Sequence, residues 1–133
     1  MNIVNKTNLP LPDKNSDKPP IFDRAYAGDR CMVAIIGDLR QAYAESLFDE
    51  AVGLFKSGVK DLILDFRKLD YTDTAGLQNL VRIYKYSKEN VGLRFAILTR
   101  PGVILDILKT CRFDKFIHIS QDESEFNDNW QEG

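Results

Sequence analysis

The stretch from Leu69 to Leu77, written Leu-Asp-Tyr-Thr-Asp-Thr-Ala-Gly-Leu, joins two segments with different apolar patterns. Before it, Leu62-Ile63-Leu64 forms an apolar run typical of a buried strand. After it, apolar side chains recur at helical spacing, at Leu77, Leu80, Val81 and Tyr84. Loops at the C-terminal ends of parallel strands are the usual place for function in such sheets. We therefore expect the polar residues of this junction to form a functional site.

The same alternation of strand and helix patterns extends in both directions from the junction. We expect strands at residues 21–26, 31–36, 62–66, 94–98 and 116–119, with a hairpin turn at residues 27–30. Helical spacing predicts three helices and a short fourth one after Gln121. The apolar face of the first helix includes Ala44, Leu47 and Phe48, and that of the second includes Leu77, Leu80 and Val81. The apolar face of the third, which we expect to be buried, includes Val103, Ile104, Ile107, Leu108 and Cys111.

This order predicts an α/β fold with a mostly parallel central sheet, an N-terminal antiparallel hairpin strand and about four helices. The run from Val33 to Ile36 lacks alternation, which predicts a strand buried on both faces. Three loops should share one end of the sheet: residues 37–39, 67–73 and 99–102.

Length and composition predict one globular domain. The chain has 133 residues, of which 44% are hydrophobic, and this suits a single core over residues 21–133. Residues 1–20 contain four of the five prolines among polar side chains, so we expect a disordered tail there.

Charge and residue usage disfavour several classes of function. The net charge of -2 gives no general attraction to nucleic acid or to an anionic membrane surface. No apolar run is long enough to span a bilayer, and the polar N-terminus lacks the apolar segment of a signal peptide. Cys31 and Cys111 lack metal-site spacing, and His118, the only histidine, has no apparent second ligand. We expect a cytoplasmic protein with reduced thiols and no metal site.

Three motifs of the chain resemble the STAS domain family, and within it the anti-sigma factor antagonists. They are Ile36-Gly37-Asp38-Leu39, the strand Leu62-Ile63-Leu64-Asp65-Phe66, and Asp73-Thr74-Ala75-Gly76-Leu77 at the start of a helix. The resemblance covers roughly residues 31–120 by element order. In that family, a partner that is both kinase and anti-sigma factor phosphorylates the hydroxyl residue after the aspartate. The resemblance therefore implies Thr74 as the phosphate acceptor, although the family's common form has two serines where this chain has Thr74 and Ala75.

The resemblance also implies a docking surface around Thr74. We expect partner contacts from the side chains of Asp38, Leu39, Asp73, Ala75, Gly76, Gln78, Arg82 and Arg100. Asp73 is a candidate helix cap as well as a candidate partner contact, and both roles are compatible. Gly76, which has no side chain, should leave room for the partner's ATP.

The implied partners are an anti-sigma factor with kinase activity and a metal-dependent serine/threonine phosphatase that removes the phosphate. The domain would bind the kinase when unphosphorylated and be released on phosphorylation. The chain has neither a phosphate-binding GxxxxGK[ST] loop nor a nucleophile-and-base pair. We therefore expect a binding module without a cofactor, and not an enzyme.

Two other functions stay open from the sequence. STAS domains also serve as subunits of lipid-transport ABC complexes, in which the domain would dock constitutively on the ATPase subunit. A receiver domain phosphorylated on Asp65 is the third possibility, because Leu64-Asp65 resembles the strand-end aspartate of such proteins. Receivers begin with a strand and an acidic pair that holds Mg²⁺, whereas this chain begins with a hairpin and Asp38 has no acidic neighbour.

Overall fold

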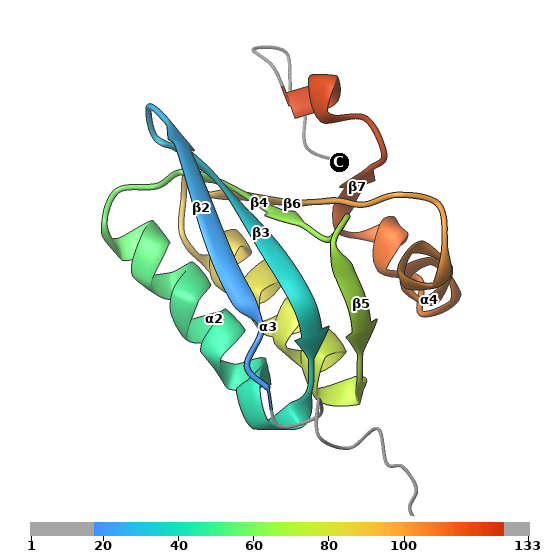
Figure 1. Ribbon diagram of the computed structural model, residues 1–133. Helices are drawn as coiled ribbons and strands as arrows, with labels where there is room; N and C mark the ends of the chain where they lie inside the picture. The colour runs from blue at the N-terminus through green and yellow to red at the C-terminus, as the bar shows by residue number, and fades with distance from the viewer. Residues whose placement is uncertain (1–17, 127–133) are drawn as a thin grey trace, which may run out of the picture.

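The computed structural model describes residues 18–126, which form a central sheet with helices packed against it (Figure 1). The predicted tail lies outside the described residues except for residues 18–20, and residues 127–133 also lie outside them. None of the described helices combines the length and the apolar composition that crossing a bilayer requires.

The described residues contain six strands and three α-helices. The strands are β2 (Ile21–Ala27), β3 (Arg30–Leu39), β4 (Asp61–Asp65), β5 (Leu69–Thr72), β6 (Arg94–Leu98) and β7 (His118–Ser120). The α-helices are α2 (Gln41–Lys56), α3 (Thr74–Glu89) and α4 (Val103–Thr110), and two 3-10 turns are η2 (Phe113–Lys115) and η3 (Glu123–Phe126). The prediction of about four helices was therefore wrong by one, because the segment after Gln121 forms only the 3-10 turn η3.

The sheet has the strand order β2-β3-β4-β6-β7, with β2 antiparallel to β3 and the other neighbours parallel. This confirms the predicted α/β class, the mostly parallel sheet and the opening hairpin. The loop expected at residues 67–73 was wrong in part, since residues 69–72 form β5, which pairs with β3. The loop expected at residues 37–39 was also wrong, because β3 continues through them with a register shift between Gly37 and Asp38. Gly37 has a φ of 106°, a left-handed conformation that glycine adopts without strain.

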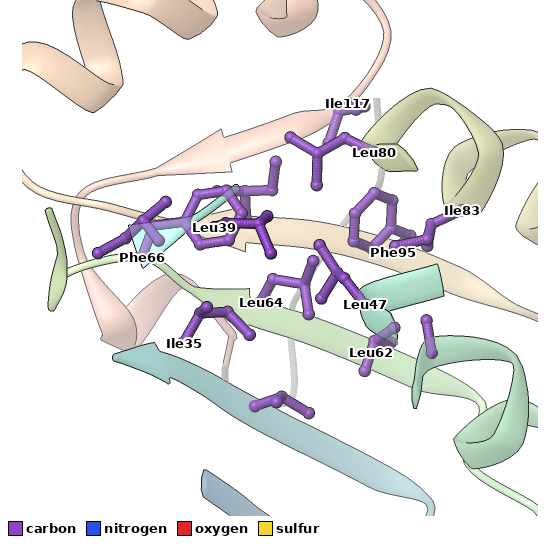
Figure 2. Close-up of a cluster of buried hydrophobic side chains, with 14 of the residues drawn as sticks. Ile35, Leu39, Leu47, Leu62, Leu64, Phe66, Leu80, Ile83, Phe95 and Ile117 are labelled. Atoms are coloured by element: carbon purple, nitrogen blue, oxygen red, sulfur yellow. The ribbon is translucent and has the colours of Figure 1, made fainter. Parts of the chain in front are cut away.

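The main core lies between the sheet and the helices α2 and α3, as Figure 2 shows. It includes Ile35 from β3, Leu47 from α2, Leu64 from β4, Ile83 from α3 and Phe95 from β6, and none of these five side chains is exposed at all. Burial of such side chains contributes the main favourable free energy of folding.

The opposite face of the sheet is only partly covered. There, Phe126 of η3 packs against Ile63, Ala96 and Leu98. Along β3, Val33 and Ile35 are buried while Ala34 and Ile36 are half-buried, so the expectation that this strand is buried on both faces was wrong.

The α4 helix is short, and its burial differs from the sequence prediction. Ile104, Leu105 and Leu108 are buried, whereas Val103 is 69% exposed and Cys111 lies on the surface after the helix end. The predicted burial of Val103 and Cys111 was wrong because the helix is short: Val103 is its first residue, and Cys111 follows its last residue.

An ion triad crosses three neighbouring strands at one end of the sheet. Arg30, Asp61 and Arg94 stand opposite one another in the register of β3, β4 and β6. Arg94 donates to both oxygens of Asp61, at 2.8 Å each, and Arg30 lies 3.4 Å from Oδ2. Burial of Asp61 raises its pKa, but the hydrogen bonds and charges of Arg94 and Arg30 outweigh burial, so the net pKa is lowered.

We expect Asp61→Asn to destabilise the fold by about 1–3 kcal/mol at neutral pH, because two partly buried guanidinium groups lose their counter-ion. Since the carboxyl pKa is lower in the folded state, this stabilisation is present above the unfolded pKa near 3.9 and is lost as the pH falls through the folded pKa. Urea unfolding of both proteins between neutral and acid pH measures the difference. A stability gap that stays constant down to the lowest pH would contradict this origin.

Candidate functional site

The candidate site lies where β5 ends and α3 begins. Asp73 is the N-cap residue of α3, with extended backbone, and its Oδ1 accepts a hydrogen bond from the Gly76 N–H at 3.1 Å. Thr74 is the first residue of the helix and is exposed. This confirms the predicted cap and the predicted placement of Thr74 at a helix N-terminus. The positive end of the helix dipole favours an anion at that position.

The Asp73 carboxylate also serves the neighbouring helix. Its Oδ2 accepts a hydrogen bond from the Gln41 N–H, the first residue of α2, at 2.7 Å. Arg40, the N-cap residue of α2, makes no capping bond with its own side chain. In addition, the Asp73 N–H donates to the Leu39 carbonyl at 3.3 Å. The Asp73 carboxylate therefore caps two helices, and the Asp73 N–H joins the end of β3 to the start of α3.

Two of the predicted partner contacts, Gln78 and Arg82, lie with Thr74 on one exposed stripe of α3. Thr74, Gln78 and Arg82 are spaced by four residues and are all exposed, with Ala75 half-buried beside them. Arg82 is held in place, because it donates to Asn79 Oδ1 at 2.8 Å and its guanidinium lies 3.9 Å above the Phe48 ring of α2. We call Thr74, Ala75, Gln78 and Arg82 the α3 stripe.

Two residues predicted to contact a partner are part of the interior. The Leu39 side chain is 1% exposed and belongs to the main core, so it cannot reach a partner. Gly76 is also buried. A Cβ atom at position 76 would lie 2.0 Å from Thr72 Oγ1 and 3.1 Å from Leu39 Cδ2. The expectation that Gly76 leaves room for ATP was wrong, because Thr72 and Leu39 fill that space and the glycine permits close packing of α3 on the sheet.

We expect Gly76→Ala to destabilise the fold by about 1–3 kcal/mol through overpacking against the short, buried Thr72 side chain. The double variant with Thr72→Ala should recover part of this loss, because the clashing oxygen is removed. Thermal or urea unfolding of the two single variants and the double variant measures the coupling. Strictly additive effects would mean that the Thr72 hydroxyl is not the obstacle.

Asp38 reaches the same end of the sheet, together with a residue that the sequence prediction missed. Asp38 pairs with Tyr71 in the register of β3 and β5, and its Oδ2 lies 3.2 Å from an Arg40 guanidinium nitrogen. The Arg40 guanidinium also lies 4.2 Å from the centre of the Tyr71 ring. The sequence signal that could have identified Arg40 is its position directly after the motif Gly37-Asp38-Leu39.

The structure does not bring Arg100 to Thr74. Arg100 Nε donates to the Arg67 carbonyl at 2.8 Å, just before the start of β5, whereas Thr74 follows the other end of that strand. The segments at residues 67–70 and 99–102 therefore lie side by side, as predicted, whereas β5 carries the chain away from them before Thr74.

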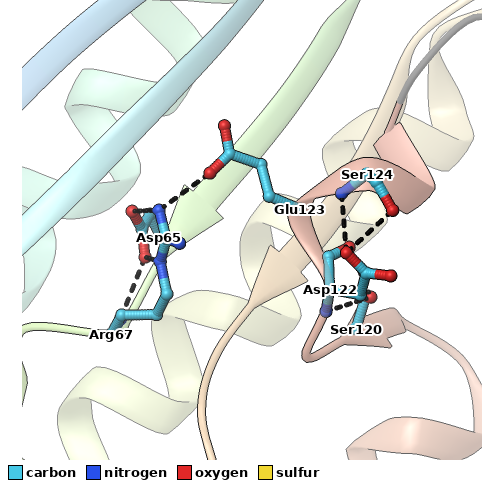
Figure 3. A network of polar contacts seen from close by, with 6 residues as sticks. All are labelled: Asp65, Arg67, Ser120, Asp122, Glu123 and Ser124. Atoms are coloured by element: carbon cyan, nitrogen blue, oxygen red, sulfur yellow. Dashed lines mark hydrogen bonds and ion pairs between the residues drawn. The ribbon is translucent and has the colours of Figure 1, made fainter.

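A polar network at the end of β4 bears on the receiver-domain interpretation (Figure 3). The Arg67 side chain donates to both Asp65 oxygens, at 3.0 and 2.9 Å, and lies 3.2 Å from Glu123 of η3. These hydrogen bonds raise the pKa of Arg67. Asp65 is 8% exposed, so the guanidinium occupies the place that a cation would need in front of its carboxylate. Asp65 thus forms an ion pair with Arg67, and Arg67 in turn links η3 to the end of β4 through Glu123.

The remaining titratable candidate also has a structural role. His118 lies on the edge strand β7, and its Nε2 is 3.2 Å from Glu125 Oε1. Its ring packs edge-on against Phe126, with centroids 5.5 Å apart. His118 therefore has a packing role at the sheet edge. Within residues 18–126, no three acidic, histidine or cysteine residues are grouped to hold a metal ion.

Comparison with known proteins identifies the class. The family model of the STAS domain matches residues 23–126, so the chain belongs to the STAS domain family. The match begins inside β2 and ends at the last residue of η3, and it therefore covers the whole sheet apart from the first two residues of β2.

Solved structures of low sequence identity share the fold. An anti-sigma factor antagonist from Mycobacterium paratuberculosis is 14% identical, with a TM-score of 0.72 over 88% of this chain and 94% of that chain. The unphosphorylated anti-sigma factor antagonist SpoIIAA is 16% identical, with a TM-score of 0.62 over 79% and 92%. The phosphorylated form of SpoIIAA, described as a Bacillus cell fate determinant, is 15% identical, with a TM-score of 0.61 over 79% and 95%.

Proposed function

We propose that this chain is an anti-sigma factor antagonist that works by partner switching. Unphosphorylated, it binds an anti-sigma factor with serine/threonine kinase activity, and phosphorylation of Thr74 releases it. The observation that carries the proposal is the exposed Thr74 hydroxyl at the first position of α3, directly after the Asp73 cap. The α3 stripe and Asp38 would form the docking surface around it.

The chemistry requires nothing from this chain except a positioned hydroxyl. The Thr74 oxygen would attack the γ-phosphorus of ATP held by the kinase, ADP would leave, and a base of the kinase would take the hydroxyl proton. The chain would therefore act by binding, without a cofactor of its own. A metal-dependent serine/threonine phosphatase would hydrolyse the phosphate ester and restore the binding form.

The environment of Thr74 supports a modification that leaves the fold intact. Thr74 is exposed, and the N-terminus of α3 favours negative charge. Asp73 keeps its capping bonds to Gly76 and Gln41 through backbone groups, which do not involve the Thr74 side chain. A phosphate would thus change the surface charge by about -1.5 to -2 and leave the core packing as it is.

The structural neighbours give further support. SpoIIAA is an anti-sigma factor antagonist whose structure is known in an unphosphorylated and in a phosphorylated form, and it shares the fold of this chain. By analogy, we place the chain in bacterial transcription regulation, as a cytoplasmic phosphoprotein.

Size-exclusion chromatography of this chain mixed with its anti-sigma factor kinase tests the proposal. We expect a stable complex in the presence of Mg²⁺ and ADP, and dissociation with a phosphorylated chain after exchange into ATP. The Thr74→Ala chain should stay bound in both nucleotides. If the wild-type chain instead co-purifies with a transporter ATPase, and Thr74→Glu does not weaken that complex, the domain is a constitutive ABC subunit and the proposal is wrong.

A further inference from the structure

We propose that Arg40 is the phosphate-binding residue of the switch: when Thr74 carries a phosphate, the Arg40 guanidinium leaves Asp38 and binds that phosphate. This inference rests on the proposed modification of Thr74. It assigns to the site a second cation, which lies outside the α3 stripe and its Arg82, and it adds a second charge change to the one made by the phosphate itself.

Backbone contacts place Arg40 beside Asp73, the residue before the proposed phosphate acceptor Thr74. Leu39 is paired with Thr72 in the register of β3 and β5, and its carbonyl accepts from the Asp73 N–H. The Gln41 N–H, on the other side of Arg40, donates to the Asp73 carboxylate at 2.7 Å. Arg40 therefore lies between two residues that are both bonded to Asp73, the direct neighbour of Thr74. The Arg40 guanidinium already reaches the ring of Tyr71, three residues before Thr74.

The Arg40 guanidinium has donors to spare. It makes one hydrogen bond to Asp38, at 3.2 Å, and otherwise packs on the Tyr71 ring. Its Nε is buried and has no hydrogen-bond partner among the described residues. A guanidinium carries five N–H donors in a planar fork that suits phosphate oxygens.

Position 40 is also an unfavourable place for a cation in the free domain. It is the N-cap of α2, where the helix dipole favours negative charge, and the capping role there belongs to Asp73. In the free domain the guanidinium is held only by its pair with Asp38 and its packing on the Tyr71 ring. A phosphate on Thr74 would add an anion to these partners.

The competition between the two anions favours the phosphate. The pair of Arg40 and Asp38 is partly exposed, with side chains 34% and 22% accessible, so it contributes little to stability. A phosphate offers more charge and can bind two guanidinium nitrogens at once. Transfer of Arg40 would leave Asp38 without its counter-ion. The docking surface would then present the Asp38 charge in addition to the phosphate, and a partner carboxylate would be repelled by both.

The test measures the second ionisation of phosphothreonine placed at position 74 during translation, so no kinase is needed. Phosphorus NMR follows this ionisation in the otherwise wild-type chain and in Arg40→Gln, Arg40→Lys and Lys109→Gln. A bound guanidinium stabilises the dianion, whereas the negative charges of Asp73, the residue before Thr74, and of Asp38, the partner of Arg40, oppose it. We expect Arg40→Gln to raise the phosphate pKa by about half a unit, a threefold change in the proton dissociation constant. The phosphate pKa of Arg40→Lys should lie between those of the parent and Arg40→Gln. The phosphate pKa of Lys109→Gln, a change at the far end of α4, should equal that of the parent.

A second measurement does not depend on the variants folding. The Arg40 side-chain N–H signal of the intact domain, assigned by nitrogen NMR, should move strongly when Thr74 is replaced by phosphothreonine. The proposal is overturned if the Arg40 signal does not move. It is also overturned if the phosphate pKa is the same in Arg40→Gln as in the parent chain. If the phosphate is unaffected but Arg40→Gln weakens the unphosphorylated complex, Arg40 binds a partner carboxylate instead. Because the phosphate is installed without the kinase, these outcomes are independent of whether the kinase binds this chain.

Discussion

Thr74→Glu should weaken binding of the anti-sigma factor kinase by about two orders of magnitude. A glutamate at this exposed helix start adds one negative charge to the centre of the proposed docking surface. Against a partner carboxylate at ~5 Å, the repulsion is about 3 kcal/mol at an effective dielectric constant near 20. Roughly 1.4 kcal/mol corresponds to a factor of ten in affinity. Titration calorimetry or surface plasmon resonance with the purified kinase measures the change.

The matched control is Thr110→Glu, which adds the same charge at an exposed position at the C-terminal end of α4. It should leave the affinity within a factor of a few of the wild type, because solvent and salt screen charges far from the interface. Equal effects of the two glutamates would mean that total charge, and not the position of residue 74, controls binding. An undiminished affinity for Thr74→Glu would contradict an electrostatic switch at this position.

Asp73→Asn should destabilise the domain by roughly 1–2 kcal/mol, although asparagine is normally as good an N-cap as aspartate. The reason is the double role of the carboxylate, since one oxygen accepts from Gly76 and the other from Gln41. Asparagine has one acceptor oxygen, and its NH₂ group would face an N–H donor of the second helix. Asp73→Ala should cost more, because it removes both acceptors. Urea unfolding monitored by circular dichroism measures each loss.

The control is Asp49→Asn, which makes the same chemical change on the exposed side of α2, and it should alter the stability by less than about 0.5 kcal/mol. If Asp73→Asn is equally neutral, water replaces the carboxylate at the Gln41 N–H and the link between the two helices has little energetic weight.

The sequence predicts the sheet and the two long helices because their apolar patterns are long and regular. It fails at β5, where only four residues pair, two of them exposed, so no alternating pattern distinguishes the strand from a loop. It also ends β3 too early, since Gly37 and Asp38 are typical turn residues and the strand passes through them by a shift in register. These short-range errors have one cause: pairing with a distant strand overrides local turn preference.

In the candidate site, too, local features could be predicted from the sequence and tertiary contacts could not. Thr74 and the Asp73 cap follow from local spacing, and the structure places both as predicted. The burial of Leu39 and Gly76 depends on how closely α3 packs on β3 and β5, which local sequence does not encode. Arg40 and the second bond of Asp73 depend on contacts between residues more than thirty positions apart. Tertiary contacts of this kind cannot be deduced from periodicity.

The central claim concerns one hydroxyl, and mapping the phosphate tests it most directly. The full chain is incubated with its anti-sigma factor kinase, Mg²⁺ and ATP, and the modified residue is located by peptide mass spectrometry. The account predicts a single phosphate on Thr74 and none on the Thr74→Ala chain. Phosphate on another residue, with Thr74 unmodified, would contradict it.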